Sequence, residues 1–257
     1  FRYCYGNYFN MNKKNLLNSI YSNIKTILGA LCIALAIRSL FFQPFYIPSS
    51  SMEPNLLIGD RIFVSKYTYG FSKHSFPFSP NISNNRLFYK IPEQGDLVVF
   101  KTPADNRTDY IKRLIGLPGD EIQFVEGLLF INGKKIDRKK TKGIKNIRCG
   151  KFSFETNAFS ETLPNGKKYT AVYNKSGTMM NSKKFKVPKD HFFLLGDNRD
   201  CSRDSRYLDS VGYVNYINLV GKAQLIFFSN DTVKGSLFKF WNIKDSFRPN
   251  RLFKKIK

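Results

Sequence analysis

An apolar run near the N-terminus constrains this chain more than any other feature. The segment ILGALCIALAIRSLFF (Ile27 to Phe42) is interrupted only by Arg38 and Ser39. Counted back to Asn23 it holds about 20 residues, the length that a helix needs to cross the hydrocarbon core of a bilayer. A cleaved signal peptide is the alternative, but the segment that ends the apolar run and follows it, LFFQPFYIP, is bulky rather than small. We therefore expect a retained transmembrane anchor over residues 23–42, with Arg38 reaching the outer interface.

The basic residues around this run predict its orientation. Three lysines precede it, whereas no lysine or arginine occurs between Leu40 and Asp60. The positive-inside rule then makes residues 1–22 a cytoplasmic tail and places residues 43–257 across the membrane. Met11 resembles a natural start, so we assign no function to residues 1–10.

The net charge and composition limit the kinds of binding partner that we expect. The 257 residues carry a formal net charge of +23, which is compatible with attraction to anionic lipid or nucleic acid and equally with a general bias toward Lys, Asn and Ile. Nucleic acid is the least favoured partner, since an exported domain rarely meets it. No His/Cys cluster has metal-ligand spacing, so we expect no metal. Cys149 and Cys201 would share the oxidising side, and the sequence leaves open whether they pair.

Short β-branched and aromatic segments bounded by Gly, Pro or Asn dominate the exported region and predict an all-β domain. Glu126-Gly127 and Asn132-Gly133 are typical of hairpin turns. The expected strands are residues 60–65, 95–101, 109–116, 121–125, 128–132, 169–173, 191–195 and 222–229.

Three stretches interrupt this pattern. Residues 71–94 are rich in Ser, Asn and Pro and predict a long loop. Residues 134–186 are rich in Lys, Gly and Asn and predict an inserted smaller β subdomain. The basic, aromatic tail from Lys234 to Lys257 fits either a membrane surface or the β core.

Two dense motifs place a serine and a lysine just beyond the apolar run. Ser51 lies in IPSSSMEPNLLIGDR (Ile47 to Arg61), and Lys112 lies in DYIKRLIGLPGD (Asp109 to Asp120). A serine hydroxyl becomes a strong nucleophile only when a base takes its proton, and a neutral lysine amine can be that base. Apolar neighbours favour desolvation of such a lysine. Ser51 follows Phe42 by nine positions, so any reaction there lies within about 30 Å of the bilayer.

Ordinary structural roles remain open for both residues. Ser51 would also suit a turn between Pro48 and Pro54, and Lys112 would suit an exposed strand. A third polar motif, GDNRDCSRDSR (Gly196 to Arg206), interrupts an apolar strand and favours a functional site. The chain has 2 histidines and no G-x-S-x-G sequence, which argues against a Ser-His-Asp enzyme.

In this order the motifs resemble those of the bacterial type I signal peptidases (leader peptidases), serine peptidases with a Ser-Lys dyad. IPSSSMEPNLLIGDRIFVSKYTYG is similar to the nucleophile motif, GDLVVFK to the following strand, DYIKRLIGLPGDEI to the general-base motif and GDNRDCSRDSR to the final motif. The resemblance covers most of the exported domain. It implies a mostly β, membrane-anchored catalytic domain in the bacterial inner membrane, working without a cofactor or metal.

The resemblance also implies the chemistry. Neutral Lys112 would take the proton from Ser51, which would form an acyl-enzyme with an exported preprotein cut after an Ala-x-Ala-like site. The Ser51 N–H and the Ser49 hydroxyl would stabilise the oxyanion. Keeping the lysine neutral near pH 8 requires its pKa to fall by about 2 units, roughly 3 kcal/mol, which burial can supply.

Four further residues would support the catalytic pair. The Ser202 hydroxyl would orient the Lys112 amine by a hydrogen bond. Asp204 would hold Arg206 and Arg113 in an ion-pair network, and Arg113 would help to lower the pKa of Lys112. Shallow pockets for the small substrate side chains would be lined by Phe45, Ile47, Pro48, Met52, Leu56, Tyr110 and Ile111, although core packing is the alternative for these seven.

Three positions depart from the family pattern: Ser50 stands in place of glycine, Asn55 in place of threonine and Cys201 in place of asparagine. All three are small or polar, so they put local turn geometry in doubt rather than catalysis. Two other functions stay open: a membrane-tethered β protein without catalysis, and a basic protein that binds anionic lipid or nucleic acid.

Overall fold

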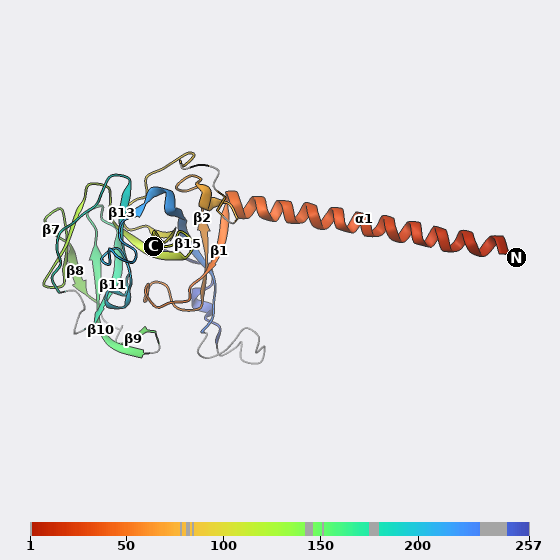
Figure 1. Cartoon of the computed structure of the whole chain (residues 1–257). Coiled ribbons are helices and arrows are strands. Elements are labelled where there is room, and N and C mark those ends of the chain that lie inside the picture. The colour runs from red at the N-terminus through yellow and green to blue at the C-terminus, as the bar shows by residue number, and fades with distance from the viewer. Residues whose placement is uncertain are drawn as a thin grey trace.

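The computed structural model consists of one long helix that leads into a β domain (Figure 1). It describes residues 2–77, 79–80, 83, 85–141, 146–150, 152–174, 180–231 and 246–256, with side chains from residue 15 onward.

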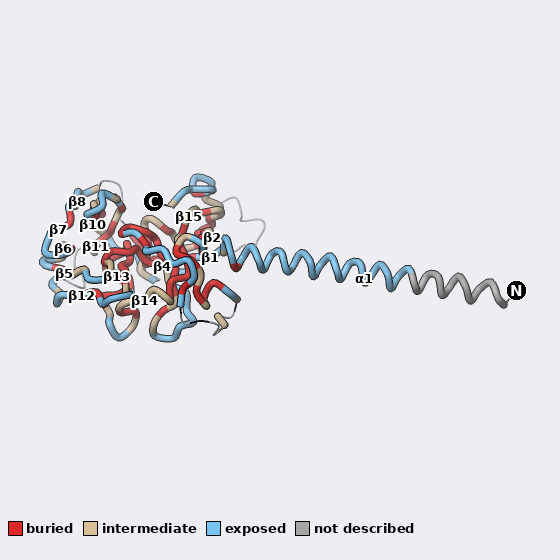
Figure 2. The backbone as a smooth tube through the Cα atoms, turned by 90° about the horizontal axis from the view of Figure 1, so that it is seen from above, coloured by how far each residue is buried: buried red, intermediate tan, exposed pale blue. Residues whose placement is uncertain are grey.

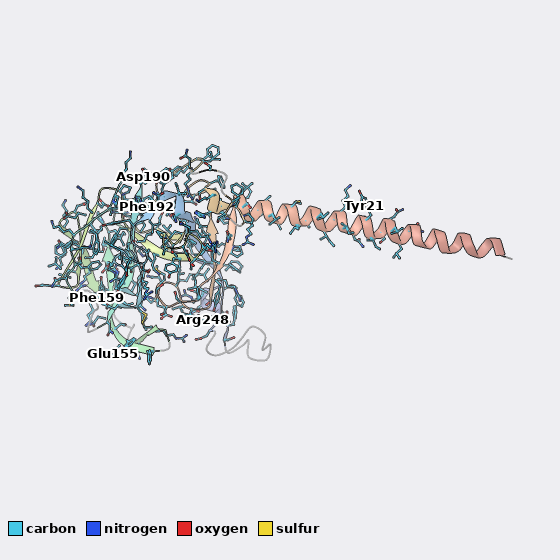
Figure 3. All side chains as sticks on the ribbon, in the orientation of Figure 1. Tyr21, Glu155, Phe159, Asp190, Phe192 and Arg248 are labelled. Carbon is cyan, nitrogen blue, oxygen red and sulfur yellow. A yellow bond between two sulfur atoms is a disulfide. The ribbon has the colours of Figure 1, made fainter. Side chains whose placement is uncertain are left out.

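Helix α1 (Arg2–Leu40) projects away from the β domain. Its segment Asn15–Leu40 is long and apolar enough to cross a membrane. The apolar side chains of this segment are exposed rather than packed on protein (Figure 2). Tyr21, for example, extends from the helix far from the β domain (Figure 3). Apolar side chains without protein partners fit a lipid environment.

The main sheet has eight strands in the order β1-β2-β15-β3-β4-β13-β14, with β16 paired to β15. Its members are antiparallel neighbours throughout. Their bounds are β1 (Phe42–Tyr46), β2 (Asp60–Ser65), β3 (Leu97–Lys101), β4 (Asp109–Gly116), β13 (His191–Leu195), β14 (Val214–Asn215), β15 (Leu219–Ser229) and β16 (Lys254–Lys255).

Two four-stranded sheets complete the domain. One joins β12 (Phe185–Lys186), β5 (Glu121–Val125), β6 (Leu128–Ile131) and β7 (Lys134–Lys135). The other joins β11 (Lys168–Asn174), β10 (Phe152–Thr162), β8 (Asp137–Lys140) and β9 (Asn146–Cys149). Short 3-10 turns also lie between strands in the described part of the chain: η1 (Lys73–Ser75), η2 (Arg199–Cys201), η3 (Tyr216–Asn218) and η5 (Pro249–Arg251).

The central strands of the main sheet are buried on both faces. Strand β3 shows this most clearly, because its successive side chains point to opposite faces. Leu97 and Val99 belong to one apolar cluster, together with Ile62 of β2, whereas Val98 and Phe100 belong to another. A third cluster lies under β5 and β6. The central strands therefore form a rigid support for the side chains and loops at their ends.

The mostly β prediction is confirmed, and every expected strand is present. Both predicted hairpin turns have two successive residues at positive φ, at Glu126-Gly127 and Asn132-Gly133, as tight hairpins require. Within the described part of residues 71–94, η1 and the Phe71–Leu87 bridge are the regular elements. Residues 134–186 hold β7 to β12. The predicted tail begins outside the described residues, which resume at residue 246.

Candidate active site

Ser51 and Lys112 meet in the structure although they are 61 positions apart. Ser51 lies in the turn between β1 and β2, and Lys112 lies on β4, where it pairs with Val98 of β3. The Lys112 Nζ donates a hydrogen bond to the Ser51 Oγ at 2.7 Å. Both residues are buried, with exposed fractions of 8% for Ser51 and 4% for Lys112.

Burial changes the acidity of this lysine. Removal from water lowers the pKa of Lys112 to about 8. The charges of Asp204 and then Asp197 act in the opposite direction, and that of Arg206 adds to the lowering. The cation that assists desolvation is thus Arg206 rather than the predicted Arg113. An amine with such a pKa is neutral in a large fraction of molecules near pH 8, and a neutral amine can accept a proton.

Ser49 lies beside the same hydroxyl. Its Oγ is 3.3 Å from the Ser51 Oγ, within hydrogen-bond distance. The turn between β1 and β2 therefore presents two hydroxyl groups side by side, and the Ser51 hydroxyl is the one that contacts the Lys112 amine.

The loop after β13 holds the turn that carries Ser51. The Asn198 N–H donates to the Ser51 carbonyl at 3.1 Å, and its side-chain Nδ2 donates to the Ser50 carbonyl at 3.1 Å. Gly196 permits this close approach, because a Cβ there would lie 2.6 Å from the Ser51 carbonyl oxygen and 2.1 Å from the Ser202 Oγ. Asn198 was not among the predicted site residues, although its place in the polar GDNRD segment was an available signal.

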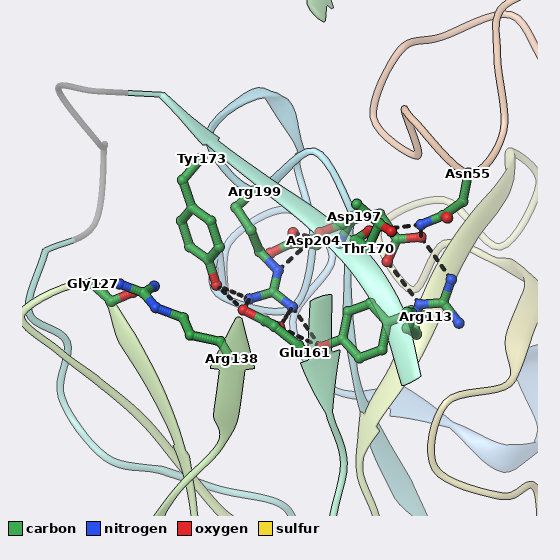
Figure 4. A network of polar contacts seen from close by, with 12 residues as sticks. Asn55, Arg113, Gly127, Arg138, Glu161, Thr170, Tyr173, Asp197, Arg199 and Asp204 are labelled. Atoms are coloured by element: carbon green, nitrogen blue, oxygen red, sulfur yellow. Dashed lines mark hydrogen bonds and ion pairs between the residues drawn. The ribbon is translucent and has the colours of Figure 1, made fainter. Parts of the chain in front are cut away.

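The ion-pair network differs from the predicted one. Asp204 does hold Arg206, at 2.8 Å, and also accepts from the Gly196 N–H at 3.0 Å. Arg113 instead forms a two-pronged pair with Asp197, with both N–O distances at 2.8 Å (Figure 4). Lys112 and Arg113 are neighbours on β4, so their side chains leave opposite faces of the strand and reach different partners.

The predicted hydrogen bond from Ser202 to Lys112 is absent. The Ser202 hydroxyl is buried and has no hydrogen-bond partner among the described residues. The reason is that the Lys112 amine is directed at Ser51, while Ser202 packs against Gly196. An unpaired buried hydroxyl near the Ser51 carbonyl is unusual, because buried hydroxyl groups nearly always have a hydrogen-bond partner.

A third buried ion pair holds η2, within the segment Gly196 to Arg206. Arg199 pairs with Glu161 of β10 at 2.7 Å, and both side chains are almost inaccessible to water. The hydroxyls of Tyr169 and Tyr173 each donate to Glu161 at 2.6 Å (Figure 4). Together these contacts lock η2, and with it the loop behind Ser51, onto β10 and β11.

An apolar cavity of about 380 Å³ opens beside the Ser51 hydroxyl. Six of the seven predicted pocket residues line it: Phe45, Ile47, Pro48, Met52, Tyr110 and Ile111. The seventh, Leu56, does not; it is 0% exposed and packs in the apolar cluster beneath the turn between β1 and β2. The prediction for Leu56 was wrong because a match to a family position does not decide whether an apolar side chain faces the cavity or the core. Lining residues that the sequence analysis missed include Ile62, Val99, Asp109 and Arg203.

Cys149 and Cys201 form a disulfide, with a Cα–Cα distance of 5.5 Å. Cys201 also lines the cavity, and its Sγ lies 3.9 Å from the Ser50 hydroxyl. The bond therefore ties β9 to η2, in the loop that hydrogen-bonds to Ser51.

Comparison with known proteins shows the family to which the chain belongs. The family model "Signal peptidase, peptidase S26" matches residues 20–228. A signal peptidase I of Rickettsia typhi is 40% identical over 244 residues, covering 88% of this chain and 90% of the relative. One of Rickettsia prowazekii is 38% identical over 267 residues, covering 96% and 98%.

A crystal structure of a signal peptidase I from Enterococcus faecalis is also similar, at 24% identity and a TM-score of 0.31, covering 52% of this chain and 97% of that one. The sequence matches define a membrane-associated serine peptidase. The chain belongs to the signal peptidase family, peptidase S26, whose members remove signal peptides from preproteins.

Proposed function

We propose that this protein is a single-pass membrane endopeptidase that cuts exported preproteins after small-x-small sites such as Ala-x-Ala, with Ser51 as nucleophile and Lys112 as general base. The 2.7 Å contact between the Lys112 Nζ and the Ser51 Oγ is the observation that carries this proposal. It places an amine of lowered pKa within proton-transfer distance of a hydroxyl at the edge of an apolar cavity.

The reaction follows from this contact. The lone pair of neutral Lys112 takes the Ser51 proton as the Oγ bonds to the scissile carbonyl carbon. The resulting ammonium then protonates the leaving amine, the C–N bond breaks, and an ester to Ser51 remains. Water attacks this acyl-enzyme while Lys112 again accepts a proton, and Ser51 is regenerated.

We assign two donors to the oxyanion of the tetrahedral intermediates. The Ser51 N–H lies on the nucleophile itself, and the Ser49 hydroxyl is 3.3 Å from the nucleophilic oxygen. Donors that are already in position stabilise the developing charge without reorganisation, and one such donor is typically worth about 10²–10³ in kcat.

Ser202, Asp204, Arg206 and Arg113 support the pair in this scheme. The unpartnered Ser202 hydroxyl lies close to the Ser51 carbonyl, because the same hypothetical Cβ on Gly196 would touch both. We assign it the role of accepting a hydrogen bond from the Lys112 ammonium once that ion forms. Asp204 and Arg206 hold the loop from which Ser202 extends.

The cavity supports the proposed preference for small, uncharged residues. Its apolar walls have room for short side chains on either side of the scissile bond, whereas the Lys112 amine and the two hydroxyls occupy its polar end. A charged side chain placed there would lose its hydration without gaining a partner.

The transmembrane anchor determines on which side of the membrane the β domain lies and how close the site is to the bilayer. We assign the N-terminus to the cytoplasm and the β domain to the outer face of the bacterial inner membrane, on the basis of the lysines that precede the span. The Cys149–Cys201 disulfide supports this side of the membrane, because disulfides persist in oxidising compartments. Strand β1 begins two residues after α1 ends, so the site stays near the bilayer, where a signal peptide would emerge.

Cleavage of a preprotein with an Ala-x-Ala site by the full chain in detergent tests this function. Ser51→Ala and Lys112→Met should each reduce cleavage by at least about 10²–10⁴-fold while the melting temperature stays near that of the unmodified protein. Lys112→Arg is a second test, since guanidinium keeps its proton at all relevant pH values and cannot act as the base. Near-normal cleavage by any of the three would refute the Ser-Lys assignment, and a folded protein that binds preproteins without cutting them would indicate a binding protein instead.

A further inference from the structure

A second cavity, separate from the one beside Ser51, lies where α1 meets the main sheet. Its volume is about 360 Å³. Arg38 lines it from the last turn of α1 and Lys66 from the end of β2. Lys101 and Arg107 line it from the end of β3 and the loop that follows. Cationic side chains from four segments of the chain thus line the same cavity.

The charges around this cavity are poorly balanced. Among the described lining residues the four cations face a single carboxylate, that of Asp109, which pairs with Lys101 at 2.9 Å. Lys66 is almost wholly buried and uses one of its three N–H donors on the Ser75 carbonyl, at 2.5 Å. Burial, followed by the charge of Arg38, lowers the pKa of Lys66 to about 8. An anion in the cavity would offset the repulsion among the four cationic side chains, and it would accept hydrogen bonds from the N–H groups that have no other partner.

His74 adds an independent sign of a missing partner. It lines the same cavity from η1 and is 5% exposed. Its Nδ1 lies 3.0 Å from the Ser79 hydroxyl, whereas its Nε2 is buried with no hydrogen-bond partner among the described residues. Burial and then the charges of Lys73 and Lys101 lower the pKa of His74 to about 4, so the ring is neutral at pH 7. When Ser79 donates to Nδ1, the Nε2–H is a donor that lacks an acceptor.

The position of the cavity at the end of α1 indicates that the anion belongs to the membrane. Arg38 lies two residues before the end of the helix that can cross a membrane, which is the level of the lipid headgroups. Exposed aromatic side chains surround this helix end: Phe42 and Tyr67 meet edge to face at 5.7 Å, and Phe76 lines the cavity. Aromatic rings of this kind are enriched at the membrane interface.

We propose that this cavity binds the phosphate of an anionic phospholipid headgroup. The proposal rests on α1 crossing the membrane and does not depend on the peptidase mechanism. Phe45 and Asp109 line both cavities, so a headgroup bound here lies directly beside the substrate site. A bound lipid would fix the height and tilt of the β domain over the bilayer and hold the substrate cavity at the level where signal peptides emerge.

Short-chain lipid titrated into the full-length protein in neutral detergent tests the site. Dihexanoyl-phosphatidylglycerol, dihexanoyl-phosphatidylcholine and inorganic phosphate are compared by calorimetry at constant ionic strength. The variant combines Arg38→Gln with Arg107→Gln, two exposed side chains outside the reactive pair. Each basic residue near a lipid surface contributes about fivefold to affinity, so the double variant should bind phosphatidylglycerol about 30-fold more weakly.

The matched control removes two charges elsewhere. Lys135→Gln with Lys186→Gln alters exposed residues of β7 and β12, at the end of the domain far from α1 (Figure 2). This control should bind phosphatidylglycerol like the unmodified protein, which should prefer that lipid to phosphatidylcholine by at least tenfold. Equal weakening in both double variants, or none in either, would overturn the site. Inorganic phosphate bound as tightly as the lipid would overturn the lipid assignment.

The same titration on Ser51→Ala keeps the two proposals apart. Loss of cleavage with lipid binding intact is expected for that variant. If no variant of the dyad affected cleavage, the peptidase mechanism would fail while this site could still stand on its own titration.

Discussion

Asn55 and Asp197 are joined by a 2.7 Å hydrogen bond from the Asn55 Nδ2 to the Asp197 Oδ2. The same Nδ2 also donates to the Thr170 carbonyl at 2.7 Å (Figure 4). Asp197 in turn binds Arg113, the neighbour of Lys112 on β4. The segment that follows the nucleophile is thus connected to the strand that carries the base. Asn55, a departure from the family pattern, has a definite structural role.

Asp197→Ala should destabilise the fold strongly. It leaves the buried guanidinium of Arg113 without its carboxylate, and breaking a buried pair in this way typically costs about 3–5 kcal/mol. Urea unfolding of the full chain in detergent measures the loss. Lys184→Ala is the control, because it removes one partner of an exposed pair with Glu121 and should cost less than about 1 kcal/mol. Equal losses for the two variants would contradict the assigned role of Asp197.

Gly196→Ala should impair both stability and cleavage. The new Cβ would lie 2.1 Å from the Ser202 Oγ and 2.6 Å from the Ser51 carbonyl oxygen, so the nucleophile turn must move. Overpacking of this kind costs about 1–3 kcal/mol, and a small displacement of the reacting atoms reduces kcat further. Gly29→Ala is the matched control, since no atom lies within 4 Å of its Cβ position. A Gly196→Ala enzyme with unchanged melting temperature and kcat would show that the three segments are less tightly packed than described.

Ser202→Ala should separate activity from stability. Its hydroxyl is buried without a partner among the described residues, so its removal should leave the unfolding free energy unchanged or slightly higher. If the hydroxyl accepts from the Lys112 ammonium during the reaction, kcat should fall by at least about tenfold, since a hydrogen bond to a charged group is worth about 1.5–3 kcal/mol. Single-turnover cleavage combined with thermal melting measures both quantities. An enzyme with unchanged kcat would limit Ser202 to packing against Gly196.

Removal of the disulfide should destabilise the chain. The bond closes a loop with a sequence separation of 52, for which chain entropy gives about 4 kcal/mol. The double variant Cys149→Ala with Cys201→Ala should therefore melt at a lower temperature and no longer respond to a reducing agent. Cys32→Ala, which alters an exposed free thiol of α1, should melt like the unmodified protein. A melting temperature insensitive to the loss of both cysteines would contradict a structural role for the bond.

The amino-acid sequence was sufficient to predict the individual strands and their bounds. Strands β2, β4, β5 and β13 have the predicted bounds, because alternation and turn residues act over a few positions. The order of the main sheet was beyond this reasoning, since β15 inserts between β2 and β3 from far along the chain. Such pairings depend on the packing of the whole domain rather than on nearby residues.

The candidate active site also has a part that could be predicted from the sequence and a part that could not. Motif spacing singled out Ser51 and Lys112, whose atoms the fold then brings to 2.7 Å. Partner choice within the polar motif was not predictable, because Asp197 and Asp204 are both acidic and only the three-dimensional path of the loop decides which one reaches Arg113. Leu56 was misplaced for a related reason, since the direction of a side chain from an irregular turn follows no periodicity.

The pH dependence of kcat/KM tests the central claim most directly. Lys112 acts as a base only when neutral, and burial lowers its pKa to about 8, so the neutral fraction rises as the pH passes through that value. For a preprotein with an Ala-x-Ala site, kcat/KM should increase about tenfold per pH unit below pH 7 and level off above about pH 9. A rate that is flat between pH 6 and 9, or that keeps rising beyond pH 10 as an ordinary exposed lysine would require, would contradict a buried Lys112 as the base.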